Sequence, residues 1–390
     1  MNHGRTVFAQ LLEFIPFGHF EHLVDRFAAN RGVSEFTAWS HLLCMTYAQL
    51  TRREGLRDLV ACLNSQRSKL YHIGIRARVS KSTLADANER RDWRMFEALG
   101  QRLITIALEL YRDEDIGLGL KAPLYAMDST TIDLCLSLFP WADFRSTKAA
   151  VKAHTIIDLR GAIPVFISIT TGKVHDINLL DAVMLPAGSI VVVDRGYLDF
   201  ARLFALTQRQ GSFIVRAKDN LRYTWIASRE VGRSTGLCAD QTTSCWSPRS
   251  PSKAIRNGCA AFLSAIRDPG SGLHLIFLTN RFDLPALTVA AIYKQRWQIE
   301  LFFKWLKQNL TVKHFFGNSE NAVKAQIWTA ICTYLLVLIA KKRLNLAASP
   351  QILLNLIEVN MFEKISINQM VTDALLNFED YYPDNQLNLL

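Results

Sequence analysis

One polar stripe along a predicted helix constrains this chain more than any other feature of its sequence. Polar residues recur at intervals of 3, 4, 4 and 3, which is the spacing of a single helix face. They are Tyr293, Arg296, Glu300, Lys304 and Lys307. Apolar residues fill most of the remaining circumference, so we expect one helix that is largely buried. A glutamate between arginine and lysine on the polar strip of a buried helix is typical of a functional site.

The charge of the chain favours an anionic partner. Its 390 residues include 45 Lys and Arg against 35 Asp and Glu, a net charge of +10. Hydrophobic residues make up 49%, which excludes a disordered chain. A length of 390 residues predicts two or three structural units. Nucleic acid is the commonest anionic partner of a basic protein, and a basic enzyme without a polymer substrate is the alternative.

The cysteines and the apolar runs of the sequence indicate the cellular compartment in which the protein is expected to act. The seven cysteines show no Cys-x-x-Cys pair and no zinc-ligand spacing, which predicts reduced thiols in a cytoplasmic protein. The N-terminus lacks the apolar run of a signal peptide, and the longest apolar stretch, residues 327–340, is too short to span a bilayer. It predicts a core helix. No membrane contact is therefore expected. The chain has no G-x-x-x-x-G-K-[ST] loop, so no nucleotide cofactor is expected.

The N-terminal region is helical in pattern and basic. Within it, residues 56–63 and 81–91 predict two helices of a helix-turn-helix, the second capped by Ser80 or Ser82. Lys81 and Ser82 would lie at the helix end that meets phosphates and base edges. The connection is longer than in a standard helix-turn-helix, so a helical bundle with a solvated basic face is the alternative.

Further along, the pattern changes to short strands alternating with helices. A hairpin across residues 160–161 and a fully apolar strand at 189–193 predict an α/β core, while 222–272 is rich in Ser, Thr, Gly, Arg and Pro and predicts an insertion. The expected organisation is a helical DNA-binding domain over residues 1–118, the first part of the core over 119–221, the insertion over 222–272, the second part of the core over 273–345, and a C-terminal helical tail over 346–390.

Two aspartates follow apolar predicted strands. Asp128 comes after residues 124–127 and Asp194 after residues 190–193. An ionised carboxylate is costly to desolvate there without a cation, and carboxylate oxygens are natural ligands of Mg²⁺. Each aspartate on its own could equally cap a strand end or a turn, and Asp133 is the substitute for Asp128.

The glutamate of the stripe completes a set of three carboxylates. If the helix of Glu300 packs across the sheet, the three groups converge and need divalent cations between them. This arrangement predicts two-metal phosphoryl transfer with Mg²⁺ or Mn²⁺. Arg296, Lys304 and Lys307 would then hold the phosphates of the substrate.

Three motifs, in order along the chain, match a known family. The stripe fits the signature Tyr-x2-Arg-x3-Glu-x6-Lys, Asp128 stands in an Asp-Ser-Thr context, and Asp194 in an Asp-x-Gly-Tyr context. With these motifs the chain resembles DDE transposases of bacterial insertion sequences, in the branch called insertion-sequence-four. The resemblance covers about residues 120–345.

The resemblance implies a fold and a chemistry. The fold is an α/β RNase H-like catalytic core, a mixed sheet flanked by helices, with a β-rich insertion and an all-helical N-terminal domain. The chemistry is cut-and-paste transposition at terminal inverted repeats, in which Asp128, Asp194 and Glu300 bind two Mg²⁺ or Mn²⁺ ions. Some members form a DNA hairpin and hold a flipped base on an aromatic residue. Trp225, Trp246 or Trp297 would serve, although core packing is favoured for Trp297.

The expected partner is double-stranded DNA, bound by a homodimer because transposition joins two ends. Tyr293, Arg296 and Lys307 would orient donor-end phosphates, and Lys152 would contact phosphate or lie on a solvated strand face. Asp176 would support the metal site indirectly. The protein would act in the bacterial cytoplasm, on nucleoid DNA. Two alternatives are an RNase H-like nuclease or resolvase without strand transfer, and a catalytically silent DNA-binding protein derived from a transposase.

Overall fold

The computed structural model describes residues 4–145, 148–182, 184–218, 262–267, 274–309 and 315–381. The chain divides into two compact units. Unit 1 consists of Met1–Arg112, Asp133–Ala149 and Lys304–Leu390, and unit 2 of Asp113–Ile132 and Ala150–Phe303. The boundaries between the units fall inside β1 (Leu124–Leu134), β3 (Lys148–Asp158) and α12 (Trp297–Asn309).

Unit 1 is built mainly from helices, and its N-terminal part is all-helical as predicted. Side-chain oxygens of Ser, Thr or Asp cap most of these helices at their N-termini, which satisfies backbone N–H groups that have no partner in the helix. The N-terminal helices are α1 (Val7–Leu12), α2 (Phe17–Arg26), α3 (Ala38–Leu50), α4 (Leu56–Ser65), α5 (Arg67–Tyr71), α6 (Lys81–Arg90) and α7 (Trp93–Leu110). The C-terminal ones are α13 (Glu320–Arg343), α14 (Pro350–Asn360) and α15 (Ile367–Tyr381).

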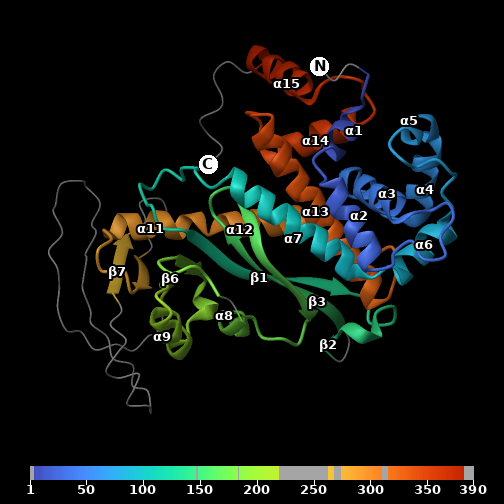
Figure 1. The fold of residues 1–390 in the computed structure, drawn as a ribbon. Helices are drawn as coiled ribbons and strands as arrows, with labels where there is room; N and C mark the ends of the chain where they lie inside the picture. The colour runs from blue at the N-terminus through green and yellow to red at the C-terminus, as the bar shows by residue number, and fades with distance from the viewer. Residues whose placement is uncertain are drawn as a thin grey trace. The chain divides into compact units, whose positions relative to one another are not determined.

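Helix α13 is the central helix of unit 1. It packs against α7 and α3, as Figure 1 shows, and Trp328 is its largest fully buried side chain. Among the described helices it alone is long and apolar enough to cross a membrane. However, 94% of its apolar window is buried inside the structure, which is the property of a core helix. The core helix predicted for 327–340 is therefore confirmed, and it is longer than expected.

The two helices predicted at 56–63 and 81–91 are present as α4 and α6, which contact each other. Ser80 caps α6, because its Oγ accepts a hydrogen bond from the backbone N of Thr83 at 3.0 Å. The connection is not a simple turn, since α5 forms within it. Leu70 of this short helix is fully buried, and its burial holds the connection against the rest of the unit.

The core of unit 2 is a mixed sheet flanked by helices, the RNase H-like architecture that was predicted. In the described chain its strand order is β2-β3-β1-β5-β6-β8-β7, with β4 paired to β3. Strands β1, β5 and β6 are parallel, whereas β4, β7 and β8 pair antiparallel with their neighbours. The remaining bounds are β2 (Asp143–Arg145), β4 (Ile163–Thr171), β5 (Ile190–Val193), β6 (Ser212–Arg216), β7 (Phe262–Arg267) and β8 (His274–Thr279).

The two faces of this sheet are covered by different helices. Side chains alternate between the faces along each strand. Met127, Val193 and Val215 belong to a core cluster with residues of α8 (Leu179–Ala182) and α9 (Phe200–Gln208). The alternate residues, such as Ala126 and Val192, are also fully buried, and this second face meets α11 (Ala286–Gln295) and the start of α12.

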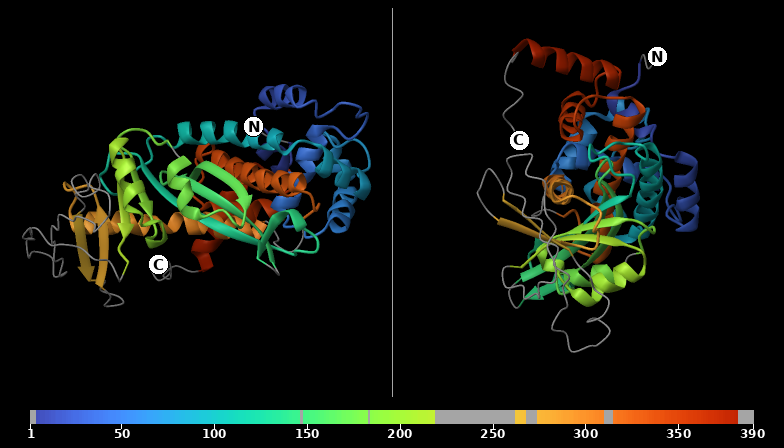
Figure 2. Two further views of the ribbon diagram at one scale, coloured as in Figure 1. Left: turned by 90° about the horizontal axis from the view of Figure 1, so that it is seen from below. Right: turned by 90° about the vertical axis from the view of Figure 1, so that its left-hand side faces the viewer.

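The prediction of one continuous helix for the polar stripe is wrong, although five of its seven apolar side chains are buried as predicted. The helix is interrupted at Arg296, where backbone bonds run three residues back, from Arg296 to Tyr293 and from Ile299 to Arg296. The helices α11 and α12 still continue each other along nearly one line (Figures 1 and 2). In addition, Trp297 and Leu301 are 57% and 50% exposed, because they border the polar stripe on the same side of α12. Core packing of Trp297 is therefore also wrong.

Most of the predicted insertion, residues 222–272, lies outside the described residues. So do Trp225 and Trp246, the two other candidates for holding a flipped base. The described part of this segment is β7, a strand that pairs with β8 along its whole length from Phe262 to Arg267.

Candidate active site

The pairing of β1 with β5 brings the two aspartates together. The parallel ladder pairs Met127 with Val193, so the next residue on each strand is Asp128 on one side and Asp194 on the other. Alternation places both side chains on the sheet face that meets α11 and α12. The backbone of Asp194, with φ −74° and ψ 164°, continues the extended course of β5. The two carboxylates thus lie side by side where the ladder ends.

The position of Asp128 differs slightly from the prediction. It was expected at the end of a strand, but β1 continues to Leu134, and only the pairing with β5 stops at Met127. The strand continues because β1 has a second neighbour, β3, on its other side. Asp133, the substitute candidate, is exposed near the end of β1.

Two residues of the predicted stripe contact these carboxylates. The Tyr293 hydroxyl donates to Asp194 Oδ1 at 3.3 Å. Arg296 donates from Nη2 to Glu300 Oε1 at 2.6 Å, and its Nη1 lies 3.5 Å from Asp128 Oδ2. The guanidinium thus connects the carboxylate of the sheet to the carboxylate of α12. Through these contacts the stripe residues Tyr293 and Arg296 connect to all three predicted acids within unit 2.

The electrostatics of the site follow from burial and from this arginine. Burial raises the pKa of Asp128 to about 6, and the neighbouring Asp194 and Glu300 act in the same direction. The Ser129 backbone N–H and the charge of Arg296 oppose that rise. Burial also acts to lower the pKa of Arg296, but the hydrogen bond to Glu300 and the charges of Tyr293, Glu300 and Asp128 together outweigh it, and the pKa is raised.

The donor set suits a hard divalent cation, but its spacing in this conformation does not. Three carboxylates are the ligands that Mg²⁺ and Mn²⁺ prefer. Yet no three His, Cys, Asp or Glu side chains in the described part of the chain are close enough together to hold a metal ion. The positive charge between Asp128 and Glu300 is instead that of Arg296.

A second group of side chains, which the sequence did not predict as a unit, supports Asp128 from the opposite face of the sheet. Ser129 follows Asp128 in β1, and its backbone N donates to Asp128 Oδ1 at 2.8 Å. Its side chain points the other way and hydrogen-bonds Asp176. The hydroxyl of Tyr197 is buried beside Ser129. Ser129 and Tyr197 belong to the motifs Asp-Ser and Asp-x-Gly-Tyr, and these motifs were the only signal in the sequence that pointed to this group.

Lys152, predicted to contact DNA, is engaged within this group. Its ammonium donates to Val174 O and to Asp176 Oδ1, both at 3.0 Å, and its side chain is only 13% exposed. His154 Nδ1 lies 3.8 Å from the same Asp176 oxygen. Burial opposes ionisation of Asp176, but hydrogen bonds from Ser129 and Lys152 outweigh it and lower its pKa. Phosphate contact by Lys152 stays a prediction, while the geometry favours a supporting role.

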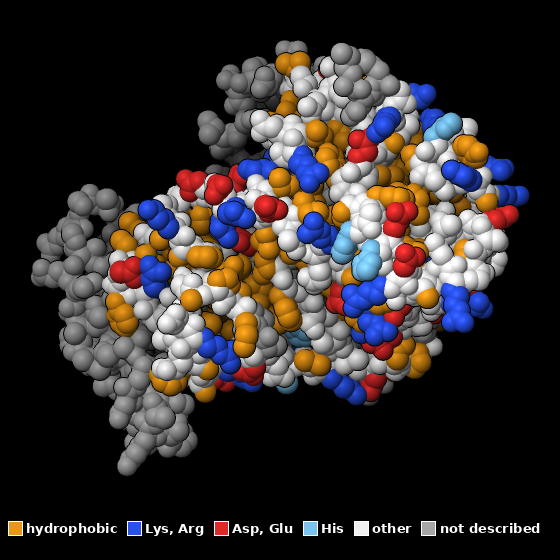
Figure 3. Space-filling view, viewed as in Figure 1, with side chains coloured by type: hydrophobic (Ala, Val, Ile, Leu, Met, Phe, Trp, Pro, Cys, Tyr) orange, Lys and Arg blue, Asp and Glu red, His pale blue; other side chains and the backbone are white. Residues whose placement is uncertain are grey.

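The remaining predicted DNA contacts lie on exposed surfaces. Lys304 and Lys307 are exposed on the second half of α12, in unit 1. Lys81 and Ser82 are exposed in the first turn of α6. Figure 3 shows Lys and Arg side chains spread over the N-terminal helices with Asp and Glu among them.

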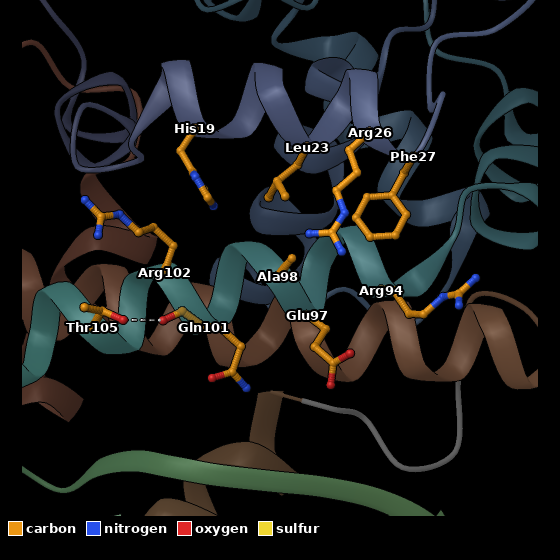
Figure 4. A pocket seen from close by; sticks show the side chains of 10 residues that line it. All are labelled: His19, Leu23, Arg26, Phe27, Arg94, Glu97, Ala98, Gln101, Arg102 and Thr105. Carbon is orange, nitrogen blue, oxygen red and sulfur yellow. Dashed lines mark hydrogen bonds between the residues drawn. The ribbon is translucent and has the colours of Figure 1, made fainter.

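A groove of about 540 Å³ runs between α2 and α7 in the same unit. Figure 4 shows Arg26 and His19 reaching into it from α2, with Arg94, Arg102 and Glu97 on α7. Arg94 is held by a hydrogen bond to Asp92 at 2.5 Å, so part of its charge is neutralised. The groove is mildly basic.

The raised pKa of Asp128 predicts a pH dependence of stability in metal-free protein. The unfolded carboxyl titrates near 3.8 and the folded one near 6, so the folded state is progressively penalised as the pH rises through that window. We expect a loss of up to about 3 kcal/mol between pH 4 and pH 7. Urea unfolding at the two pH values should show this loss in the wild type and a smaller one in Asp128→Asn. An equal loss in both proteins would remove Asp128 as its source.

Comparison with known proteins identifies the family of the chain. Residues 119–336 match the family described as the transposase DDE domain, and residues 3–76 match one described as a domain of unknown function. A Sinorhizobium fredii protein named as a transposase is 31% identical over 68% of this chain and 73% of its own length. A Geobacillus stearothermophilus protein named as the transposase of an insertion sequence element is 30% identical, over 62% of this chain and 63% of that protein.

A Synechocystis protein, named as the transposase of another insertion sequence element, is 26% identical over 70% of this chain and 75% of its own length. A solved synaptic complex of piggyBac transposase with hairpin DNA covers 97% of this chain and 85% of its own, with 10% identity and a TM-score of 0.45, too weak a likeness to bear on function. Because the DDE domain match spans more than half of the chain, the protein belongs to the DDE transposases of insertion sequence elements.

Proposed function

We propose that this transposase cuts DNA at the terminal inverted repeats of its insertion sequence and joins the freed 3′ ends to target DNA by a cut-and-paste route. One observation carries the proposal. The strand register places Asp128 beside Asp194, and Arg296 ties Asp128 to Glu300, so the three acids of the family motifs meet in one place. The complete Tyr-Arg-Glu-Lys signature supports placement in the insertion-sequence-four branch.

In this proposal Asp128, Asp194 and Glu300 hold two Mg²⁺ or Mn²⁺ ions. Bound ions of this kind activate a water or a 3′-hydroxyl and stabilise the leaving oxygen. The protein's own groups orient the substrate. Tyr293 fixes Asp194 through its hydroxyl, and Arg296 presents a guanidinium suited to two oxygens of a phosphate. Ser129 holds Asp128 through its backbone N–H.

The DNA backbone is held by basic and polar side chains outside this centre. Lys304 and Lys307 extend the stripe along α12 and contact donor-end phosphates. Lys81 and Ser82, at the exposed N-terminal end of α6, contact the terminal repeat, and the helical region 1–118 serves as the end-binding domain. The active species is a homodimer on DNA, because two ends are joined at once. It acts in the bacterial cytoplasm.

The test is cleavage and joining of a labelled duplex that ends in the element's own inverted repeat. With Mg²⁺ or Mn²⁺, wild-type protein should nick the strand at the element end and then link the new 3′ end to an unlabelled target duplex. Without metal neither product should form. Nicking without joining would reassign the protein as a nuclease, and binding without nicking would show a silent DNA-binding protein.

A further inference from the structure

A pocket of about 850 Å³ opens on unit 1 beside α1. Of its lining residues only Lys364 lies outside residues 3–76, the part of the chain that matches a domain of unknown function. None of the lining residues belongs to the carboxylate site. The volume is in the range of pockets that take small molecules or single groups of a larger ligand. The lining therefore indicates what this region binds.

One wall of the pocket is aromatic and held in place. The rings of Phe17 and Trp39 both line it, with centroids 5.1 Å apart and planes at 85°. The indole N–H of Trp39 donates to Ile73 O at 3.0 Å, and a Cβ at Gly74 would lie only 2.7 Å from the indole ring. Trp39 thus has little room to turn. Phe17 is 49% exposed, although its side chain is aromatic. The two rings form a fixed corner that is partly open to solvent.

The rest of the lining carries an excess of positive charge. Its ionisable side chains are Arg5, Glu13, Lys69, His72 and Lys364. Glu13 is the only acid among the lining residues, and Arg5 pairs with it. Lys69 and Lys364 are exposed, and neither forms an ion pair with any residue that the structure describes. Two ammonium groups therefore stand beside the aromatic corner without a counter-ion from the described chain.

An aromatic corner beside two free cations suits a nucleotide. A planar base that lies on one ring meets the other ring edge-on, which are both favourable aromatic arrangements. The phosphate of the same nucleotide supplies the negative charge that Lys69 and Lys364 lack. An acidic peptide segment would neutralise the lysines but would not by itself bring a planar ring to the corner. In a double helix the base faces are covered by their neighbours, so only an unpaired nucleotide can offer one.

We propose that this pocket binds an unpaired nucleotide of a DNA strand, with its base against Phe17 and Trp39 and its phosphate at Lys69 and Lys364. The site goes beyond the end cleavage and the duplex contacts proposed above, and it needs no metal. Its tests are run in a chelator and measure binding alone. They can therefore fail while end cleavage holds, or succeed while end cleavage fails.

The first test is the affinity of the full-length protein for a short labelled oligothymidylate, measured by fluorescence anisotropy. Phe17→Ala should weaken binding by roughly 5- to 100-fold, the usual effect of removing one stacking ring. The control is Tyr71→Ala, because Tyr71 is 50% exposed on α5 and does not line the pocket. It should leave the affinity unchanged. No loss in Phe17→Ala, or an equal loss in both variants, would overturn the proposal.

The second test is the salt dependence of the same binding. Lys69→Gln and Lys364→Gln should each lower the slope of log affinity against log salt by about 0.7, the effect of one lost phosphate contact on a single strand. Phe17→Ala should weaken binding without changing the slope. The control is Arg67→Gln, since Arg67 is exposed on the same short helix as Lys69 but lies outside the lining. Unchanged slopes in both lysine variants, or the same change in Arg67→Gln, would contradict the phosphate contacts.

A third test uses wild-type protein, so it stands even if a variant does not fold. An oligonucleotide that carries iodouracil is photocrosslinked to the protein, and the attached peptide is identified by mass spectrometry. The crosslink should fall on Phe17 or Trp39, and crosslinks that fall only elsewhere would refute the site. Thymidine monophosphate should compete with the oligonucleotide only at a large excess, because it lacks the neighbouring phosphates. Competition at equal concentration would exclude the strand as the source and identify a free nucleotide as the ligand.

Discussion

Asp194→Asn is expected to lower the rate of metal-dependent nicking by roughly 10³-fold or more, and Glu300→Gln should do the same. Each substitution keeps the shape of the side chain and removes one negative charge from the metal site. Bound ions supply several kcal/mol of transition-state stabilisation, and each 1.36 kcal/mol corresponds to a factor of ten in rate. The loss should appear in single-turnover cleavage of an inverted-repeat duplex at saturating protein, which separates chemistry from DNA binding.

The matched control for these two variants is Asp133→Asn. Asp133 is an exposed acid on the same strand as Asp128. Its substitution should leave the nicking rate within a few-fold of wild type, while Asp128→Asn should behave like Asp194→Asn. The opposite pattern, with Asp133 essential and Asp128 dispensable, would transfer the first catalytic position to Asp133.

Trp328→Ala is expected to lower the free energy of unfolding by about 3–5 kcal/mol. Trp328 is 1% exposed and lies on α13, the helix around which unit 1 is built. Truncation would leave a large cavity against α7, because a Cβ at Gly100 of that helix would lie only 2.9 Å from the Trp328 ring. Chemical denaturation monitored by far-ultraviolet circular dichroism measures the loss. A change under 1 kcal/mol would show that the packing around Trp328 is loose.

A pair of glycine variants tests the same contact. A Cβ at Gly100 would lie 2.9 Å from the Trp328 ring, so Gly100→Ala should destabilise by about 1–3 kcal/mol, although alanine is the better helix former. Gly18, in α2, has nothing within 4 Å of its would-be Cβ, and Gly18→Ala should be neutral or stabilising by up to about 1 kcal/mol. Similar effects at both positions would show that close packing is not the reason for glycine at 100.

Local pattern was sufficient for much of the fold. Apolar runs bounded by turn residues located β5 and the β3–β4 hairpin, and the cap of α6 is Ser80, one of the two candidates that the sequence offered. These features depend on periods of two or 3.6 residues and on short-range hydrogen bonds, which a linear sequence displays directly. The family motifs added the mixed sheet and the order of its elements.

Other features depended on long-range packing. No proline or glycine marks Arg296 as a helix break, and the interruption coincides with ion pairs to Asp128 and Glu300. The exposure of Trp297 also had no signal in its apolar character. An apolar residue is buried only if another element covers it, and the sequence does not say where that cover ends.

The three acids could be predicted from the sequence, because their motifs combine an apolar strand or helix with a carboxylate that such surroundings rarely tolerate alone. The contacts that hold these acids could not be predicted. Asp128 and Asp194 are 66 positions apart in the numbering and become neighbours only through the register of β1 and β5. The bridging role of Arg296 and the support of Asp128 by Ser129 and Asp176 arise from side chains on different elements. Such contacts are set by three-dimensional distance, to which sequence separation gives no guide.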